Sequence, residues 1–166
     1  VRQKKGLIKN PKSKRGFMAV KARAGIVLSK LNPNKPVVEG QRVGVVDDSV
    51  VRGDTSTTVN GQLRDSGVLK IVQLIASMPY VETCEFGMDT KDASVLVSRG
   101  RSAAEVAKKI NADEIHFLTR ENFERSLGPK LIGKVCMKCM TGEDPTATPV
   151  QIQTRQEYLE KTLANL

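Results

Sequence analysis

The spacing of apolar and polar positions predicts a strand, a loop, a helix and a second strand in the middle of the chain. Residues 42–46, RVGVV, form a short apolar run of the kind found in buried strands. Residues 55–65 repeat apolar side chains at helical spacing, so we expect Val59 and Leu63 to face inward. A second apolar run at residues 68–76 predicts the next strand. So short a connection between two strands favours a mostly parallel α/β sheet.

The remainder of the chain shows the same alternation less regularly. Ser102 and Glu105 have the spacing of a capping box, which predicts the start of a second helix. Residues 114–119 predict a third strand, on which we expect His116 to pack in the core rather than bind a metal. The other predictions are a basic loop at 1–18, a partly helical segment at 19–31, a turn-rich connector at 32–40, a loop at 77–90, a short helix at 121–128, an irregular stretch at 129–149 and a terminal helix.

The charge is unevenly distributed along the 166 residues. The net charge is +9, and residues 1–42 hold 12 of the 27 Lys and Arg residues but only one of the 18 Asp and Glu residues. Such a segment is typical of proteins that bind nucleic acid or a highly phosphorylated small molecule, and also of solvated tails. Phe17 is the one aromatic residue within it, which argues against a stacking platform for single strands.

Chain length and hydropathy limit the number of domains and argue against a membrane protein or a secreted protein. The chain is one domain or a piece of a larger protein. No apolar run approaches the length of a membrane span, and no apolar stretch follows the first basic residues, so we expect neither a membrane anchor nor a secretory signal.

Two adjacent acids follow the first predicted strand, in the string VVDDSVVRGDTSTT. They would lie at the carboxyl end of a parallel strand, where open α/β sheets bind ligands. The loop then enters a helix N-terminus, whose main-chain N–H groups favour an anion. A bare Asp-Asp-Ser more often caps a turn, but a phosphorylated ribose carrying magnesium pyrophosphate would suit both the loop and the acids. The candidate residues are Asp47, Asp48, Ser49, Arg52, Gly53, Asp54, Thr55, Ser56, Thr57 and Thr58.

Three cysteines, two of them in the C-x-x-C string CMKC, do not form a disulfide framework. They indicate a reducing compartment and a metal or cluster site. Three interpretations stay open: an iron–sulfur cluster, a zinc site with His116 as fourth ligand, and buried thiols without a metal.

The string VVDDSVVRGDTS closely resembles the phosphoribosyl-pyrophosphate motif of the glutamine phosphoribosylpyrophosphate amidotransferases. Its Ser-x-x-Arg-Gly continuation is specific to that family among phosphoribosyltransferases. Other segments agree in order, up to about residue 149. GLIKN and RGF resemble the catalytic lid loop, NADEIHFLTRENFERSLG resembles a later strand and helix, and CMKCMTGEDP resembles the late cysteine pair.

The resemblance implies a phosphoribosyltransferase fold and the first committed step of purine synthesis, in which ammonia from glutamine displaces pyrophosphate to give 5-phosphoribosylamine. It implies that Asp47 and Asp48 bind ribose hydroxyls and assist Mg²⁺, and that Arg52 to Thr58 hold the 5′-phosphate. Lys9 and Arg15 would neutralise the leaving pyrophosphate, which explains the basic segment without nucleic acid.

The same resemblance implies further cofactors and partners. Cys84, Cys136 and Cys139 match three ligands of a [4Fe–4S] cluster whose fourth ligand lies upstream. We expect a cytoplasmic homo-oligomer that works with a glutaminase domain or subunit. The expected organisation is a lid loop and connector at residues 1–41, a phosphoribosyltransferase core with the cysteines at 42–150, and a terminal helix at 151–166.

The sequence departs from the family pattern in three respects. It contains neither the glutaminase domain nor the Pro-Asp-Ser-Gly-like turn that grips pyrophosphate, so we expect this chain to be inactive alone. The lid reads Lys12-Ser13-Lys14 where the family has Tyr-Val-Gly, and Asp54 replaces a small neutral residue, so we expect Asp54 to point to solvent. Two alternatives remain: a non-catalytic phosphoribosyl-pyrophosphate-binding module, and a nucleic-acid-binding protein that uses residues 1–42.

Overall fold

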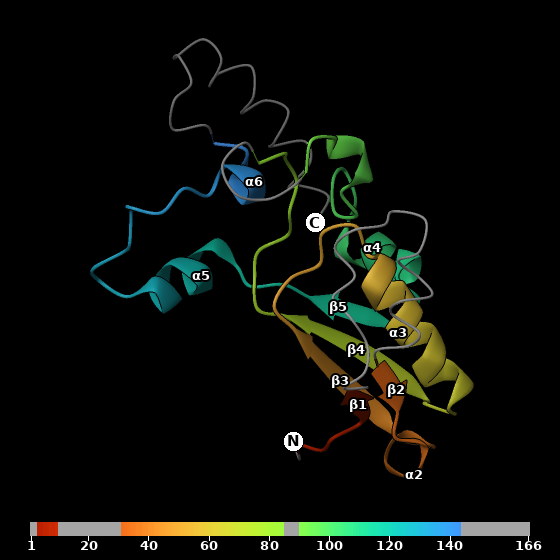
Figure 1. The fold of residues 1–166 in the computed structure, drawn as a ribbon. Coiled ribbons are helices and arrows are strands. Elements are labelled where there is room, and N and C mark those ends of the chain that lie inside the picture. Colours follow the sequence, from red (N-terminus) through yellow and green to blue (C-terminus); the bar gives the residue numbers. More distant parts are fainter. Residues whose placement is uncertain (1–2, 10–30, 85–89, 144–166) are drawn as a thin grey trace.

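The computed structural model describes residues 3–9, 31–84 and 90–143 (Figure 1). The elements in chain order are β1 (Leu7–Lys9), β2 (Leu31–Pro33), α2 (Lys35–Val38), β3 (Arg42–Asp47), α3 (Asp54–Asp65), β4 (Lys70–Ile75), the 3-10 turn η2 (Ala93–Val95), α4 (Ala103–Lys109), β5 (Glu114–His116), α5 (Arg120–Leu127) and α6 (Lys138–Thr141).

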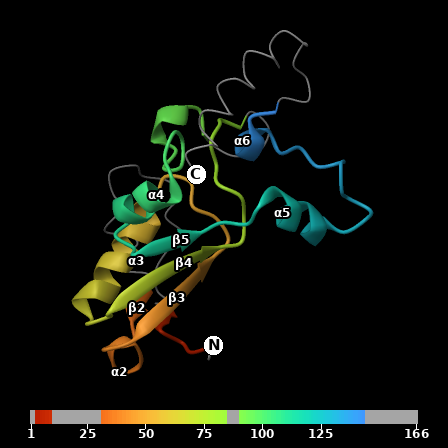
Figure 2. The same cartoon turned by 180° about the vertical axis from the view of Figure 1, so that it is seen from behind.

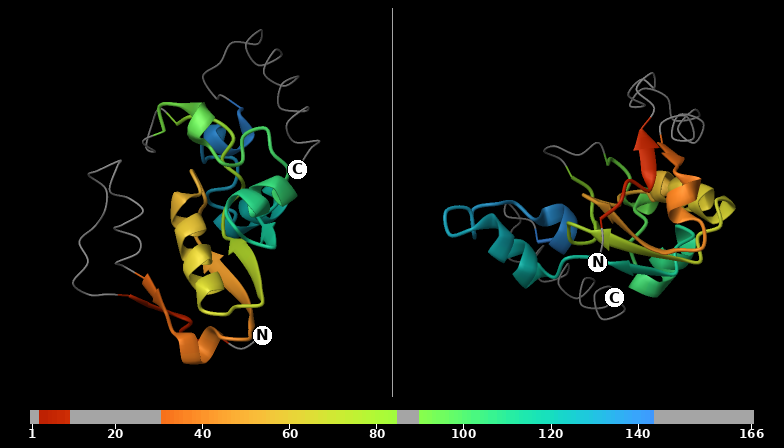
Figure 3. Two further views of the ribbon diagram at one scale, coloured as in Figure 1. Left: turned by 90° about the vertical axis from the view of Figure 1, so that its right-hand side faces the viewer. Right: turned by 90° about the horizontal axis from the view of Figure 1, so that it is seen from below.

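The central feature is a parallel sheet in the order β3-β4-β5. Helix α3 connects β3 to β4, and α4 precedes β5, and both helices lie on the same face of the sheet (Figures 1 and 3). One-sided placement is expected when successive parallel strands are joined by right-handed crossovers. The predicted parallel α/β fold is therefore confirmed.

Two apolar clusters fill the space between this face and the helices. Val59 and Leu63 of α3 are 5% and 2% exposed, which confirms that they face inward. They pack with Ile71 of β4 in one cluster, whereas the other joins α4 to β5. The second cluster contains Val50, Ile75, Val97, Val106, Ala107, Ile110 and Ile115.

Within the described residues the other face of the sheet is open, and Val46 and Leu74 on it are 74% and 41% exposed. Parallel sheets are normally covered on both faces, so these side chains are unusual for the architecture. The His116 side chain is 60% exposed and lies 3.2 Å from Glu114, so the prediction that His116 packs in the core is wrong. Its neighbour Ile115 takes the inward position, because successive side chains of a strand alternate between faces.

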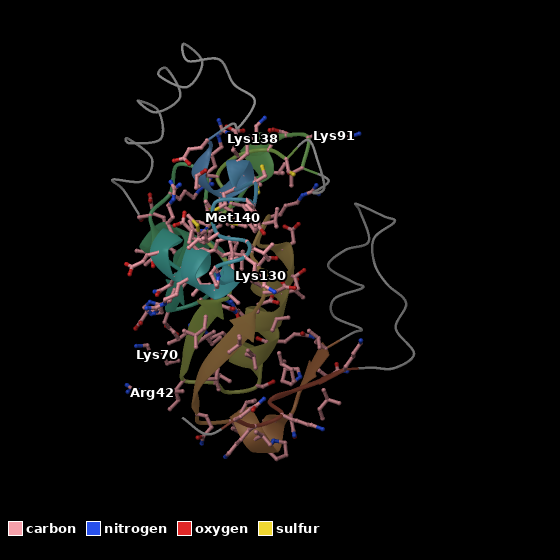
Figure 4. The ribbon with its side chains drawn as sticks, turned by 90° about the vertical axis from the view of Figure 1, so that its left-hand side faces the viewer. Arg42, Lys70, Lys91, Lys130, Lys138 and Met140 are labelled. Carbon is pink, nitrogen blue, oxygen red and sulfur yellow. The ribbon has the colours of Figure 1, made fainter. Side chains whose placement is uncertain are left out.

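Figure 4 looks toward this open side, where the neighbouring side chains of Arg42 and Lys70 project from the first residues of β3 and β4. Figure 2, from behind, shows that α5 lies beyond the sheet on the side away from α3 and α4. Within the described part of the chain, no helix is long and apolar enough to span a membrane.

The structure confirms one local prediction and corrects several others. The capping box is confirmed, because Ser102 and Glu105 each bond the other's main-chain N–H group. The third strand ends at His116 rather than residue 119. β1 and β2 pair antiparallel where a basic loop and a turn-rich connector are predicted, α2 forms within that connector, and α6 forms in the stretch predicted to be irregular. The predicted segments at 19–31 and 151–166 lie outside the described residues, apart from Leu31 in β2.

Candidate functional site

The two acids lie at the tip of β3, as the sequence predicts. Asp47 is the last residue of the strand and is half-buried, while Asp48 follows it and is exposed. The Asp48 N–H group donates to Asp47 Oδ1 at 3.0 Å, and Ser49 Oγ donates to Asp48 Oδ1 at 3.1 Å. Burial raises the pKa of Asp47, the Asp48 N–H bond opposes that shift, and the Asp48 charge adds to it. Both carboxylates therefore remain available at the edge of the sheet where ligands bind.

The loop after the acids, residues 49–53, is held in place by contacts with the core. Val50 is 3% exposed in the core, and the Val51 carbonyl accepts a bond from the Val97 N–H group at 2.8 Å. Gly53 has a φ of +86°, and a Cβ there would lie 3.0 Å from Ile110 Cγ2 and 3.2 Å from Val97 Cγ2. This position needs glycine both for its left-handed backbone and for the close approach of its neighbours.

Helix α3 begins directly after Gly53, which is its N-cap and has no side chain to bond the first-turn N–H groups. The N–H groups of Asp54, Thr55 and Ser56 have no carbonyl partner within the helix, because the first intrahelical bond runs from Thr57 N–H to the Gly53 carbonyl at 2.8 Å. Such a helix end favours an anion. Asp54 is exposed, as expected.

The hydroxyl groups in the first turns of α3 differ in whether they are available to a ligand. Thr57 Oγ1 donates to the Gly53 carbonyl and Thr58 Oγ1 to the Asp54 carbonyl, both at 2.9 Å, and Ser56 is 6% exposed. These are the bonds that Ser and Thr commonly make to the preceding turn of a helix. Thr55 is exposed at the helix start, and Arg52 is partly buried in the loop. The main-chain amides are therefore the best-placed donors for an anion.

The cysteines lie beyond the tip of β4, around α6. Cys84, Cys136 and Cys139 form no disulfide with one another, and the Cys139 carbonyl accepts bonds from the N–H groups of Val81 and Glu82 at 2.9 and 3.1 Å. Burial raises the pKa of the Cys139 thiol, and the neighbouring Cys84 raises it further. Among the residues that the structure describes, however, no group of three or more His, Cys, Asp and Glu side chains is arranged to hold a metal ion.

Tyr80, in the segment after β4, is not among the residues that the sequence singles out. The segment leading to it begins at Ala76, whose N–H group donates to the Asp47 carbonyl at 2.9 Å. Tyr80 is half-buried, and its pKa is raised by burial first and then by the charges of Cys139 and Asp48. Its position after the second parallel strand could have drawn attention to it, since the carboxyl ends of parallel strands meet at one edge.

The two predicted cationic residues are not on this loop. Lys9 is the exposed last residue of β1, paired in the ladder with Leu31 of β2. Arg15, like the residues at 12–14, lies outside the described part of the chain. The structure thus places Asp47 to Thr58 in one continuous strand–loop–helix segment and Lys9 on the separate β1–β2 pair.

Comparison with known proteins found no matching family model. Relatives named amidophosphoribosyltransferase nevertheless match most of the sequence. The one from Synechococcus elongatus is 34% identical over 161 residues, which are 96% of this chain and 32% of that protein. The one from Bacillus subtilis is 36% identical over 146 residues, which are 85% of this chain and 31% of that protein. The chain is homologous to the amidophosphoribosyltransferases.

A solved structure agrees with this assignment. Glutamine phosphoribosylpyrophosphate amidotransferase from B. subtilis, in complex with ADP and GMP, superposes with a TM-score of 0.71 at 36% identity, covering 86% of this chain and 32% of that one. The chain therefore spans about a third of the length of the amidophosphoribosyltransferases it matches, and that third is their phosphoribosyltransferase portion.

Proposed function

We propose that this chain is the phosphoribosyltransferase part of an amidophosphoribosyltransferase. It binds 5-phosphoribosyl 1-pyrophosphate and transfers ammonia to it, giving 5-phosphoribosylamine for de novo purine synthesis. The observation that carries the proposal is the joint placement of Asp47 and Asp48, at the tip of β3, with the glycine-led N-terminus of α3. Homology to the amidophosphoribosyltransferases selects this reaction among those that use such a site.

Each part of the site suits one part of the ligand. The first-turn N–H groups of α3, with Thr55, take the terminal phosphate of the sugar. Asp47 and Asp48 accept hydrogen bonds from the ribose hydroxyls, and bonds to a charged acceptor are stronger than neutral ones. Ser49 and Arg52 in the loop, with Ser56, Thr57 and Thr58 in the first turns of α3, are proposed to complete the phosphate site, the last two through the bonds that their hydroxyls make to the Gly53 and Asp54 carbonyls. The sugar is thereby fixed at both ends, with C1 free for attack.

The transfer step exchanges one bond for another at C1 of the ribose. Nitrogen of ammonia forms a bond to C1 while the C1–O bond breaks, pyrophosphate leaves with the electron pair, and the nitrogen, now positively charged, releases one proton to solvent. Positive charge develops on the ring and negative charge on the departing group, so fixed cations nearby lower the barrier most when water is excluded. Lys9 and Arg15 are proposed for that role.

Mg²⁺ fits the acid pair, because Mg²⁺ in proteins usually binds one or two carboxylates together with substrate phosphates. When bound, it would neutralise the pyrophosphate. A [4Fe–4S] cluster fits less well, since a cubane takes four thiolates and this chain supplies Cys84, Cys136 and Cys139. We therefore propose the cluster only for an assembly that adds a fourth ligand, along with a cytoplasmic location, a glutaminase partner and a homo-oligomeric state.

Isothermal titration calorimetry with 5-phosphoribosyl 1-pyrophosphate and Mg²⁺ tests the proposal. Asp47→Asn and Asp48→Asn should each weaken binding by about tenfold or more, because each removes a charge-assisted contact. Asp65→Asn is the matched control, since Asp65 is an exposed acid at the other end of α3. Equal affinity in all four proteins would refute the assignment.

Activity separates catalysis from binding alone. With ammonia as nitrogen donor, the isolated chain should form no phosphoribosylamine, and measurable product would refute that expectation. If the chain binds the ligand but stays inactive when joined to a glutaminase and its upstream segment, the non-catalytic module is the better description.

A further inference from the structure

A turn at residues 96–101, here called the buttress turn, packs against the loop that follows the two acids, residues 49–53, here called the phosphate loop. The Val97 N–H group donates to the Val51 carbonyl at 2.8 Å. The Val97 side chain also closes the space beside Gly53, where a Cβ would lie 3.2 Å from Val97 Cγ2. The position of the loop therefore depends on where the buttress turn is held.

Two arginines hold this turn. Arg101 Nη1 donates to the carbonyls of Leu96, Val97 and Arg99 at 3.1–3.3 Å, which fixes the turn from within. Arg99 ties it to the segment that follows β4. Arg99 Nη1 lies 3.1 Å from Glu82 Oε1 and 3.4 Å from the Val81 carbonyl.

The Arg99–Glu82 pair is less exposed than an ordinary surface ion pair. The two side chains are 28% and 17% exposed, respectively. Glu82 is also fixed by two further bonds: the Oε1 atom that faces Arg99 accepts the Thr83 N–H group at 2.9 Å, and the Glu82 N–H group donates to the Cys139 carbonyl. A pair with one partner already fixed loses less side-chain entropy than two free side chains, so it restrains the turn effectively.

We propose that Arg99 is a positioning residue for phosphate binding, an inference that rests on the proposed function. In this proposal Arg99 does not contact the ligand. It acts through Glu82 to hold the buttress turn, which holds Val51 and Gly53, so that the first-turn N–H groups of α3 keep their direction toward the phosphate. None of the sequence motifs that point to the site includes Arg99.

Binding of ribose 5-phosphate to the full chain, measured by calorimetry, tests this role. Arg99→Ala should weaken binding by about fivefold, the effect of losing a partly buried ion pair. The charge-reversed pair Arg99→Glu with Glu82→Arg should restore most of the affinity. If that double variant does not fold, Arg99→Lys replaces it, and it should recover part of the affinity.

Arg64→Ala is the matched control. Arg64 pairs with Asp113 at 2.7 Å, is 29% exposed, and also donates to a main-chain carbonyl, that of Leu69, at 3.4 Å. It lies near the end of α3 remote from the phosphate loop. Arg64→Ala should reduce thermal stability but change the affinity by less than about twofold. An unchanged affinity in Arg99→Ala, or an equal loss in Arg64→Ala, would overturn the proposal.

A second measurement needs no ligand. Hydrogen exchange of the Val97 N–H group should be faster in Arg99→Ala than in the unaltered chain, and unchanged in Arg64→Ala. If the unaltered chain does not bind ribose 5-phosphate, the proposed function fails and the role of Arg99 in binding fails with it. If it binds, but exchange at Val97 is the same in all three proteins, only the positioning role fails.

Discussion

Replacing Gly53 by alanine should destabilise the chain by about 2–3 kcal/mol. The left-handed backbone at φ +86° costs an L-residue about 1 kcal/mol. The added methyl group would meet Ile110 Cγ2 at 3.0 Å and Val97 Cγ2 at 3.2 Å, inside a packed core. Overpacking of this kind costs roughly 1–2 kcal/mol more. Urea unfolding followed by circular dichroism measures the sum, with the m-value checked for constancy.

Gly61→Ala is the control for this substitution. Gly61 lies in the interior of α3, and a Cβ there would meet nothing within 4 Å. Alanine should therefore stabilise the chain by about 0.5–1 kcal/mol, because glycine is a poor helix former. If Gly53→Ala lowers the free energy of unfolding and Gly61→Ala raises it, the result supports the geometry described for the loop. A neutral Gly53→Ala would show that the backbone at residue 53 is not constrained as described.

Three further predictions concern buried polar groups and thiols. Asn60→Ala should cost about 2–3 kcal/mol in urea unfolding, since Asn60 is fully buried, donates to a main-chain carbonyl at 2.8 Å and accepts from Gln73 at 2.7 Å; a loss below about 1 kcal/mol would contradict this. Because burial raises the pKa of Asp47, folding disfavours its carboxylate relative to the unfolded chain, so Asp47→Asn should be more stable than the unaltered chain at neutral pH, with the gain shrinking as pH falls through the folded pKa; a gain that grows on acidification would reverse the sign. In the metal-free chain, iodoacetamide should label the exposed Cys136 faster than Cys139, whose pKa is raised by burial, as followed by peptide mass spectrometry, and the opposite order would refute the placement of the two thiols.

The centre of the fold could be predicted because its signals are local. The apolar run before Asp47, the glycine before the next helix and the inward spacing of Val59 and Leu63 all fall within one strand–loop–helix unit. The capping box at Ser102 is local in the same way. Where each residue type, its spacing and its backbone requirement agree, the sequence suffices.

The rest depends on contacts between distant segments. The β1–β2 ladder joins residues more than twenty positions apart, and neither strand has enough residues to show a period. His116 was misplaced because a run of apolar neighbours hides which face of a three-residue strand is covered. The bonds of Thr57 and Thr58 to the preceding turn are local, but they depend on side-chain rotamers, which the residue pattern does not determine.

The coupling of the site to its surroundings was likewise not accessible from the sequence. The Arg99–Glu82 pair joins the segment after β4 to the turn before α4, and the pKa of Tyr80 in that segment responds to both Cys139 and Asp48. Neither lies in a recognisable motif, and each is defined by tertiary packing alone.

The central claim is that the main-chain N–H groups at the start of α3 hold a sugar phosphate beside Asp47 and Asp48. The most direct measurement is a titration of the ¹⁵N-labelled chain with ribose 5-phosphate and Mg²⁺, followed by amide NMR. The account predicts that the largest saturable shifts fall at residues 53–57 and at the acid pair, and that they disappear in Asp47→Asn with Asp48→Asn. Shifts confined to the basic residues before position 42, or the same shifts with sulfate alone, would contradict it.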